Sequence, residues 1–261
     1  MNYRTELSIK FANQSSYLDE LFRIYPMSPE FVRDIDEEKW GEIEDSFNLR
    51  DNINLIENLL DLNLFPIKDS YVAYLRRDRS AIRRNPRTIN RLCDRIYAIG
   101  LDEVYKLCSA PKETNRQIGP LFKKWVSDGG LGIIPVGVDK FEMNDKDAVL
   151  DASDAEMKRW CADNLGYSHN KGLDFVGRFD KKYVIGEAKF LTDFGGHQNA
   201  QFADAINTLT NTSAKAVTVA ILDGVLYIGG GNNKLYRDIT ETYSKYNILS
   251  ALFLRDFLCS I

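Results

Sequence analysis

Residues 172–190 decide how this chain folds, and they read GLDFVGRFDKKYVIGEAKF. Two runs rich in β-branched and aromatic residues flank a short polar sequence, which is the pattern of two antiparallel strands joined by a tight turn. If Asp180 and Lys181 form a two-residue turn, Phe179 faces Lys182 across the hairpin. Every other pair of facing residues follows from that register.

The same register places Asp174 directly across from Glu187, with their Cβ atoms roughly 4.5–5.5 Å apart. Because side chains alternate along a strand, one face is predicted to be apolar and directed to the core, formed by Leu173, Phe175, Phe179, Val184, Ala188 and Phe190. The other face carries Asp174, Arg178, Glu187 and Lys189.

This second face predicts a metal site. Like charges directly opposite each other destabilise a sheet, so Asp174 and Glu187 require a compensating cation. Lys189 supplies one positive charge, and a divalent metal supplies the remainder. Two adjacent carboxylates are hard oxygen ligands of the kind that Mg²⁺ binds, together with water and a substrate phosphate. With Lys189 orienting water or stabilising charge, this is the chemistry of phosphodiester hydrolysis.

The acid-x-Lys triplet at 187–189 is informative only because of its setting. Similar triplets occur at 37–39, 156–158 and 180–182, the first two in segments with a helical pattern and the third in the predicted turn. The triplet at 187–189 ends an apolar strand and faces an acid across the hairpin. A structural cluster of ion pairs is the alternative interpretation.

Asp174, followed after twelve residues by Glu187-Ala188-Lys189, resembles the PD-(D/E)XK nuclease superfamily. The sequences at 172–176 and 185–189 are most similar to type II restriction endonucleases, and the resemblance covers 153–210. Leu173 stands where the superfamily usually has proline. The resemblance implies that Asp174, Glu187 and Lys189 are catalytic. It also implies that Asp174, Glu187 and the backbone carbonyl of Ala188 bind Mg²⁺.

The superfamily core also implies a helix before the hairpin that contributes another acid. Glu156 is the first candidate, on a helix that Ser153 or Asp154 caps, and Glu113 is the second. An ordinary exposed glutamate is an equally good interpretation of either residue.

The helix after the lysine strand begins near Gly195, and its N-terminus offers backbone donors and a favourable dipole for phosphate. Gln198 and Gln201 lie one turn apart, and Asn199 lies between them. All three are candidates for contacts with the active site or with DNA. Capping and solvation are the alternative roles.

Base reading requires side chains with paired donors and acceptors on segments that reach a groove. The candidates are Arg116, Asn232, Asn233 and Lys234, together with an arginine-rich run at 76–87. Each is equally well interpreted as a turn residue or a phosphate contact. For the arginine-rich run, a solvated helix face is also an alternative.

The rest of the chain predicts an α+β (α/β) protein. Apolar spacing of three and four residues predicts helices at 15–25, 51–62, 88–108 and 112–127, a mostly helical N-terminal half. Beyond them we expect a strand at 133–138, helices at 153–164, 197–210 and 246–258, and strands at 215–222 and 225–229 around an Asp223-Gly224 turn. The resemblance implies a restriction-endonuclease-like core, with a mixed sheet flanked by helices.

We expect a helical region at 1–130 for DNA recognition or dimerisation and a catalytic core at 131–261, or one compact domain. The net charge is −4, yet the run at 76–87 holds six arginines and one acid, which suits a selective polyanion binder. Four cysteines without metal-ligand spacing predict reduced, mostly buried thiols. No apolar stretch is long enough to span a membrane, and we expect a cytoplasmic, prokaryotic protein.

The residues therefore predict a Mg²⁺-dependent DNA nuclease, and the resemblance implies a type II restriction endonuclease that acts on double-stranded DNA. A homodimer is expected by analogy, because a two-fold protein matches a palindromic site. A repair or nicking endonuclease of the same fold is the first alternative. A non-catalytic DNA-binding protein is the second, and intact Asp174, Glu187 and Lys189 argue against it.

Overall fold

The computed structural model describes the chain except residues 15, 27–32, 112–113, 211–212 and 231–232, and except the side chains of 114–116 and 197. The chain forms two compact units. One consists of Met1–Met27 and Thr114–Ile261 and contains the sheet, and the other consists of Ser28–Glu113 and is helical. Residues 1–27 and 114–130 thus belong to the unit with the sheet, not with the other N-terminal helices.

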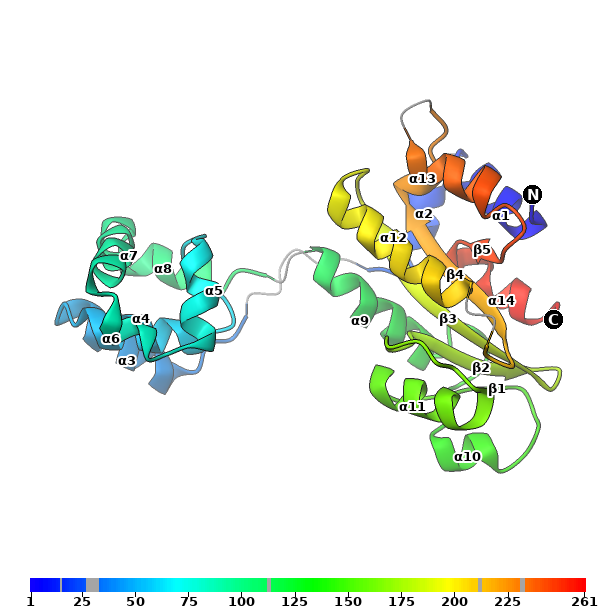
Figure 1. Ribbon diagram of the computed structural model, residues 1–261, viewed down its shortest axis with the longest axis horizontal. Coiled ribbons are helices and arrows are strands. Elements are labelled where there is room, and N and C mark those ends of the chain that lie inside the picture. The colour runs from blue at the N-terminus through cyan, green and yellow to red at the C-terminus, as the bar shows by residue number, and fades with distance from the viewer. Residues whose placement is uncertain (15, 27–32, 112–113, 211–212, 231–232) are drawn as a thin grey trace. The chain divides into compact units, whose positions relative to one another are not determined.

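The sheet has five strands in the order β1-β2-β3-β4-β5. They are β1 (Ala148–Val149), β2 (Phe175–Phe179), β3 (Lys182–Leu191), β4 (Val217–Gly224) and β5 (Ile248–Leu249). The β1–β2 and β2–β3 pairs are antiparallel, whereas β3–β4 and β4–β5 are parallel. The fold is therefore a mixed α/β fold with a mixed sheet flanked by helices, as the sequence predicts (Figure 1).

Helices of the sheet unit precede, separate and follow these strands. The α-helices are α1 (Tyr3–Ala12), α2 (Tyr17–Phe22), α9 (Thr114–Ser127), α10 (Val138–Glu142), α11 (Asp154–Leu165), α12 (Gly196–Leu209), α13 (Lys234–Arg237) and α14 (Leu254–Leu258). Shorter turns are η1 (Val225–Tyr227), η2 (Asp238–Thr242) and η3 (Ala251–Phe253). The connection from β3 through α12 to β4 is what makes these two strands parallel, and α12 lies across both of them (Figure 1).

The predicted hairpin register is confirmed. Phe179 pairs with Lys182, and Asp180 and Lys181 both have positive φ angles, 45° and 63°. Two successive left-handed residues are typical of the type I′ turn, whose twist matches that of antiparallel strands. A two-residue turn at this position determines which residues of β2 and β3 face each other.

The prediction of one apolar and one polar face is wrong, because both faces of the hairpin are buried. Val176 and Ile185 lie on the same face as Glu187, and they pack with Trp160 and Leu173 in a second core cluster. Arg178 is also buried, and its guanidinium donates hydrogen bonds to the carbonyl oxygens of Phe141 (2.8 Å) and Lys146 (2.9 Å). Helices on both faces of the sheet explain the difference.

Three of the predicted elements differ from the structure. Residues 225–229 do not pair with 215–222: β4 continues through Gly224, where φ is 101°, and the chain enters η1. Residues 246–258 contain β5, η3 and α14 in place of one helix. In the described part of the chain, 133–138 contributes only a single bridge between Val136 and Leu150. The short strand β1 was not predicted.

The helical unit contains six described helices. They are α3 (Glu37–Asn48), α4 (Asn52–Asp61), α5 (Ser70–Arg77), α6 (Ala81–Arg84), α7 (Pro86–Ile99) and α8 (Leu101–Cys108). The predicted helix at 88–108 is divided at Gly100, whose φ of 85° disfavours other residues. Leu55, Leu59, Leu92 and Ile96 are fully buried in this unit's own core.

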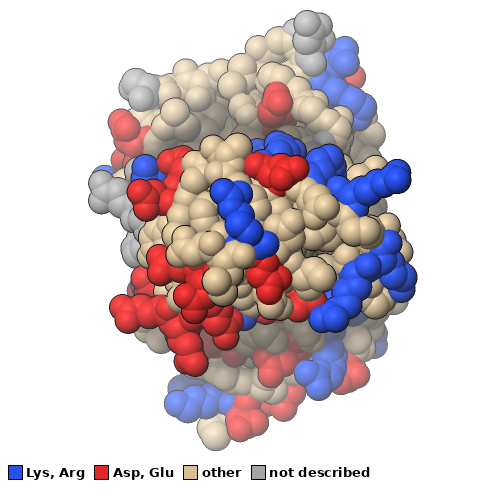
Figure 2. Space-filling model, turned by 90° about the vertical axis from the view of Figure 1, so that its left-hand side faces the viewer, with Lys and Arg blue, Asp and Glu red and all other residues tan. Residues whose placement is uncertain are grey.

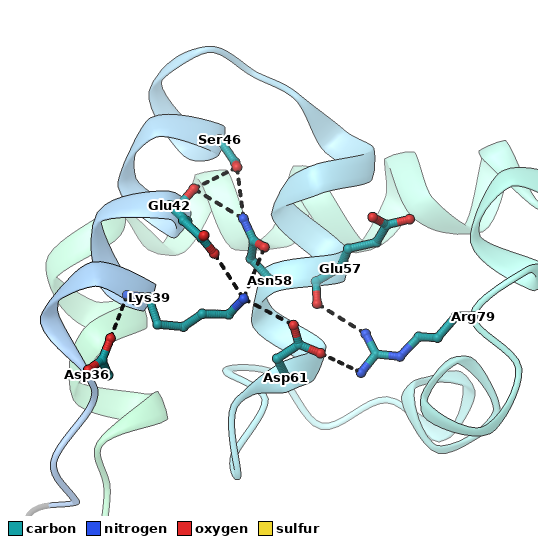
Figure 3. A network of polar contacts seen from close by, with 8 residues as sticks. All are labelled: Asp36, Lys39, Glu42, Ser46, Glu57, Asn58, Asp61 and Arg79. Carbon is teal, nitrogen blue, oxygen red and sulfur yellow. Dashed lines mark hydrogen bonds and ion pairs between the residues drawn. The ribbon is translucent and has the colours of Figure 1, made fainter.

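A polar network joins α3, α4 and the segment after α5 (Figure 3). The Lys39 ammonium lies 2.9 Å from a carboxylate oxygen of Glu42 and 3.1 Å from one of Asp61. The other oxygen of Asp61 accepts a hydrogen bond from Arg79, which also donates to the carbonyl oxygen of Glu57. Lys39 and Arg79 thus pair with two of the acidic side chains of α3 and α4.

All four cysteines are free, and Cys93, Cys108 and Cys161 are buried, which confirms the prediction of mostly buried thiols. Burial raises the pKa of each of these three thiols to about 12. None of the described helices has the length and apolar character required to cross a bilayer.

The predicted turn residue Asp223 is in fact fully buried, because four donors satisfy its carboxylate. These are the hydroxyls of Tyr17 (3.0 Å), Tyr25 (3.1 Å) and Ser250 (2.5 Å) and the backbone N–H of Ala251 (3.1 Å). Burial raises the pKa of Asp223. The carboxylate joins β4 to α2, to the segment after α2 and to η3.

We expect Asp223→Ala to lower the free energy of unfolding by roughly 3 kcal/mol or more, because it leaves four buried donors without an acceptor. Asp163→Ala on the exposed side of α11 is the matched control and should change it by less than about 0.5 kcal/mol. Urea denaturation measures both values. Equal effects of the two substitutions would show that the Asp223 network does not stabilise the sheet.

Candidate active site

The hairpin brings together the three residues that the sequence singles out. Glu187 and Lys189 lie on the same face of β3, and Asp174 immediately precedes β2. The backbone N–H of Asp174 donates to the carbonyl oxygen of Gly186 at 3.1 Å, which continues the hairpin pairing by one residue. All three side chains are therefore anchored by backbone pairing in the interior of the sheet.

Lys189 lies between the two acids. Its Nζ atom is 2.6 Å from Oε1 of Glu187 and 3.1 Å from Oδ2 of Asp174. The same Oδ2 atom accepts a hydrogen bond from the backbone N–H of Ala188 at 3.0 Å. One ammonium and one backbone donor therefore hold two carboxylates together that would otherwise repel each other.

The site is mostly buried but still open to solvent. The side chains of Asp174, Glu187 and Lys189 are 14%, 7% and 23% exposed. Burial raises the pKa of Glu187, and the neighbouring charge of Asp174 raises it further. Burial by itself lowers the pKa of Lys189, but the two carboxylates outweigh burial and the net pKa is raised. Lys189 is therefore protonated at neutral pH.

One oxygen of Glu187 is left without a partner. Oε2 is buried and accepts no hydrogen bond in the described part of the chain. An unpaired buried carboxylate oxygen costs free energy unless a donor or a cation reaches it. Among the described residues, no group of three or more acids, histidines or cysteines could hold a metal ion. The donor set of two carboxylates suits a hard cation that keeps several water ligands.

A small pocket borders Asp174 and contains an acid that the sequence did not reveal. Lys123, Asp151 and Met157 line it together with Asp174, and Asp151 is exposed. Asp151 lies two residues before Ser153, the N-cap of α11. This position before a helix is the sequence feature that could have indicated it as a site residue. Lys171 was also missed: its charge lowers the pKa of Glu187, and it forms an ion pair with Asp204 of α12.

Glu156, the first candidate for an additional acid, caps α11. Its carboxylate accepts a hydrogen bond from the backbone N–H of Ser153 at 2.9 Å, and Ser153 Oγ accepts one from the N–H of Glu156 at 3.3 Å. Hydrogen bonding to Ser153 lowers the pKa of Glu156. The side chain is exposed and used in this capping box. Glu113, the second candidate, lies outside the described residues.

The candidates at the start of α12 have different surroundings. Gln198 is buried, and its amide accepts a hydrogen bond from the N–H of Thr192 and donates one to the Thr192 hydroxyl. It therefore ties the start of α12 to the end of β3. Asn199 is exposed, and Gln201 is half-buried.

Asn233, from the predicted base-reading loop, is buried. Its amide donates to the carbonyl oxygens of Val225 (3.0 Å) and Ile228 (2.7 Å), and its Oδ1 caps α13. Lys234 is exposed beside Asp238. Asn232 and the side chain of Arg116 lie outside the described residues.

Comparison with known proteins identifies a family. The sequence model of the Tsp45I type II restriction enzyme family matches residues 2–261, nearly the whole chain. The chain belongs to the Tsp45I type II restriction enzyme family. The resemblance seen at the hairpin is therefore confirmed, and it extends to both units. No curated protein and no solved structure shows a match.

Without metal, Lys189→Met should lower the free energy of unfolding by about 2 kcal/mol or more, because it leaves two nearby carboxylates without their cation. Adding Glu187→Gln should recover part of that loss, since one of the two negative charges is removed. Chemical denaturation in EDTA measures both variants. Lys140→Met, at an exposed lysine, is the control. If Lys189→Met is as stable as the control, the lysine does not hold the acids together.

Proposed function

We propose that this chain is a Mg²⁺-dependent type II restriction endonuclease that hydrolyses both strands of duplex DNA at a short specific sequence. The products would carry 5′-phosphate and 3′-hydroxyl ends. One observation carries the proposal: in a chain of a restriction enzyme family, Lys189 lies between Asp174 and Glu187, while no described residue donates a hydrogen bond to Oε2 of Glu187.

Asp174, Glu187 and the backbone carbonyl of Ala188 would hold the cation. The unpartnered oxygen of Glu187 supports this assignment, because a cation would satisfy it without breaking the ion pair of Oε1 with Lys189. When bound, Mg²⁺ supplies activation of water and neutralisation of charge on the phosphate. Both carboxylates are attached to paired backbone, Glu187 on β3 and Asp174 through its N–H bond to Gly186.

Lys189 has a separate role. The two acids keep its ammonium protonated, and their positions fix the direction in which it points. A proton held at Nζ can hydrogen-bond to the attacking water or to a phosphate oxygen as negative charge develops there. Because the strand holds Lys189 in place, little reorganisation is needed when the substrate binds.

The remaining assignments follow from the same proposal. Arg116, Asn199, Gln201, Asn232 and Lys234 are candidate DNA contacts, whereas Gln198 would position α12 next to the site. The N-terminal region would serve DNA recognition or dimerisation, and 131–261 would form the catalytic core. We propose a homodimer, with one active site for each strand, in the cytoplasm of a prokaryotic cell.

We expect three substitutions each to reduce the rate of DNA cleavage by about 100-fold to 1,000-fold: Asp174→Asn, Glu187→Gln and Lys189→Met. This is the loss that follows removal of one group that stabilises charge in the transition state. Digestion of a supercoiled plasmid with Mg²⁺ measures the rate. Glu156→Gln, which alters only the cap of α11, should retain activity within roughly threefold.

The first product of the same digestion distinguishes the alternatives. A homodimer with one active site per strand converts circles directly to linear DNA with discrete ends. Accumulation of nicked circles would favour a nicking or repair enzyme. DNA binding without cleavage under Mg²⁺ or Mn²⁺, unaltered by Lys189→Met, would indicate a non-catalytic DNA-binding protein.

A further inference from the structure

The helical unit carries its charges in two separate segments. Residues 30–61 contain eleven acidic and three basic residues, whereas 68–95 contains nine basic and three acidic residues. Figure 2 shows the result on the surface, with acidic side chains gathered at the lower left and Lys and Arg side chains along the right-hand edge. The net charge of the whole chain, −4, conceals this separation.

Some arginines of 68–95 have structural partners. Arg76 donates to the carbonyl oxygens of Leu62 and Asn63, and Arg79 belongs to the network of Figure 3. Arg84 lies 2.6 Å from the carboxylate of Asp78. The contacts of Arg76 and Arg79 hold this segment against α4 and the residues that follow α4, whereas the Arg84 pair lies within the segment.

Arg77, Arg83 and Arg87 are different. All three are exposed, and none has an ion pair or side-chain hydrogen bond in the described part of the chain. They lie at the end of α5, in α6 and in the first turn of α7, a turn that contains no acid. We call Arg77, Arg83 and Arg87 the arginine surface. No described residue forms an ion pair with these three guanidinium groups.

Two tyrosines extend this surface along α5. Tyr71 and Tyr74 are 58% and 60% exposed, and with Arg77 they follow a three-residue spacing on one side of the helix. The Arg91 guanidinium of α7 lies over the Tyr71 ring, 5.6 Å from its centre, and Arg91 also binds Asp69 at 2.7 Å. The carboxylate of Asp69 is therefore already paired.

We propose that the arginine surface binds the phosphate backbone of duplex DNA, with Tyr71 and Tyr74 as neighbouring hydroxyl donors. The inference rests on the proposed function, and it assigns backbone binding to the helical unit in addition to the cleaving site in the sheet unit. Exposed, unpaired guanidinium groups pair well with phosphates, and tyrosine hydroxyls are common donors to them. The acidic half of the same unit would restrict binding to one side.

The experiment measures binding of a fluorescent 30-base-pair duplex of arbitrary sequence to the full chain in EDTA, where cleavage is blocked, over a range of salt concentrations. Each phosphate contact contributes about 0.9 to the slope of log K against log salt. The triple variant Arg77→Ala, Arg83→Ala, Arg87→Ala should flatten this slope by about 2 to 3 and weaken binding at least tenfold at low salt.

The charge-matched control is the triple variant Lys140→Ala, Lys146→Ala, Lys245→Ala, at exposed residues of the sheet unit. It should leave both the slope and the affinity close to wild type, and circular dichroism should show both variants folded. Equal losses in the two variants, or an unchanged arginine variant, would overturn the inference, as would stronger competition by duplex RNA than by DNA. Plasmid cleavage by the wild type is scored separately, so the inference can fail while the proposed function stands.

Discussion

The ion pair of Lys189 with Glu187 and Asp174 is the interaction on which the site depends. Two acids placed next to each other in a mostly buried part of a sheet repel, and a single ammonium at 2.6 Å and 3.1 Å holds them there. The lysine satisfies one oxygen of Glu187, and the other has no hydrogen-bond partner among the residues that the structure describes. The same three side chains therefore hold the acids together in the sheet and leave one carboxylate oxygen of Glu187 without a hydrogen bond from the described residues.

The opposite face of the sheet keeps this arrangement rigid. Lys189 pairs with Leu222 of β4, so the next residue, Asp223, directs its side chain to the face away from the site. There its carboxylate accepts hydrogen bonds from Tyr17, Tyr25, Ser250 and Ala251. The Tyr25 ring also packs edge-on against Phe190. The N-terminal segment and the C-terminal segment are thus tied to the strand that neighbours the site.

Much of the site was predictable, because it is local. The turn at Asp180-Lys181 sets the register of residues less than ten positions away, and that register brings Asp174, Glu187 and Lys189 together. The prediction of a turn at Asp223-Gly224 was wrong for the opposite reason. This dipeptide is typical of an exposed turn, and the partners that bury Asp223 lie more than 20 residues away in the sequence. The sequence left the role of Glu156 open, and the structure shows its carboxylate in the capping box of α11. The boundaries of the helical unit depend on which segments pack together, and local sequence patterns do not predict that packing.

The central claim is that the hairpin of β2 and β3 cuts DNA at one sequence, and sequencing the ends of digested DNA tests it most directly. Genomic DNA incubated with the purified chain and Mg²⁺ should yield ends that all map to one short sequence, with paired cuts in the two strands and 5′-phosphates that ligate without treatment. Ends scattered over unrelated sequences, or no new ends with any divalent metal, would contradict the account.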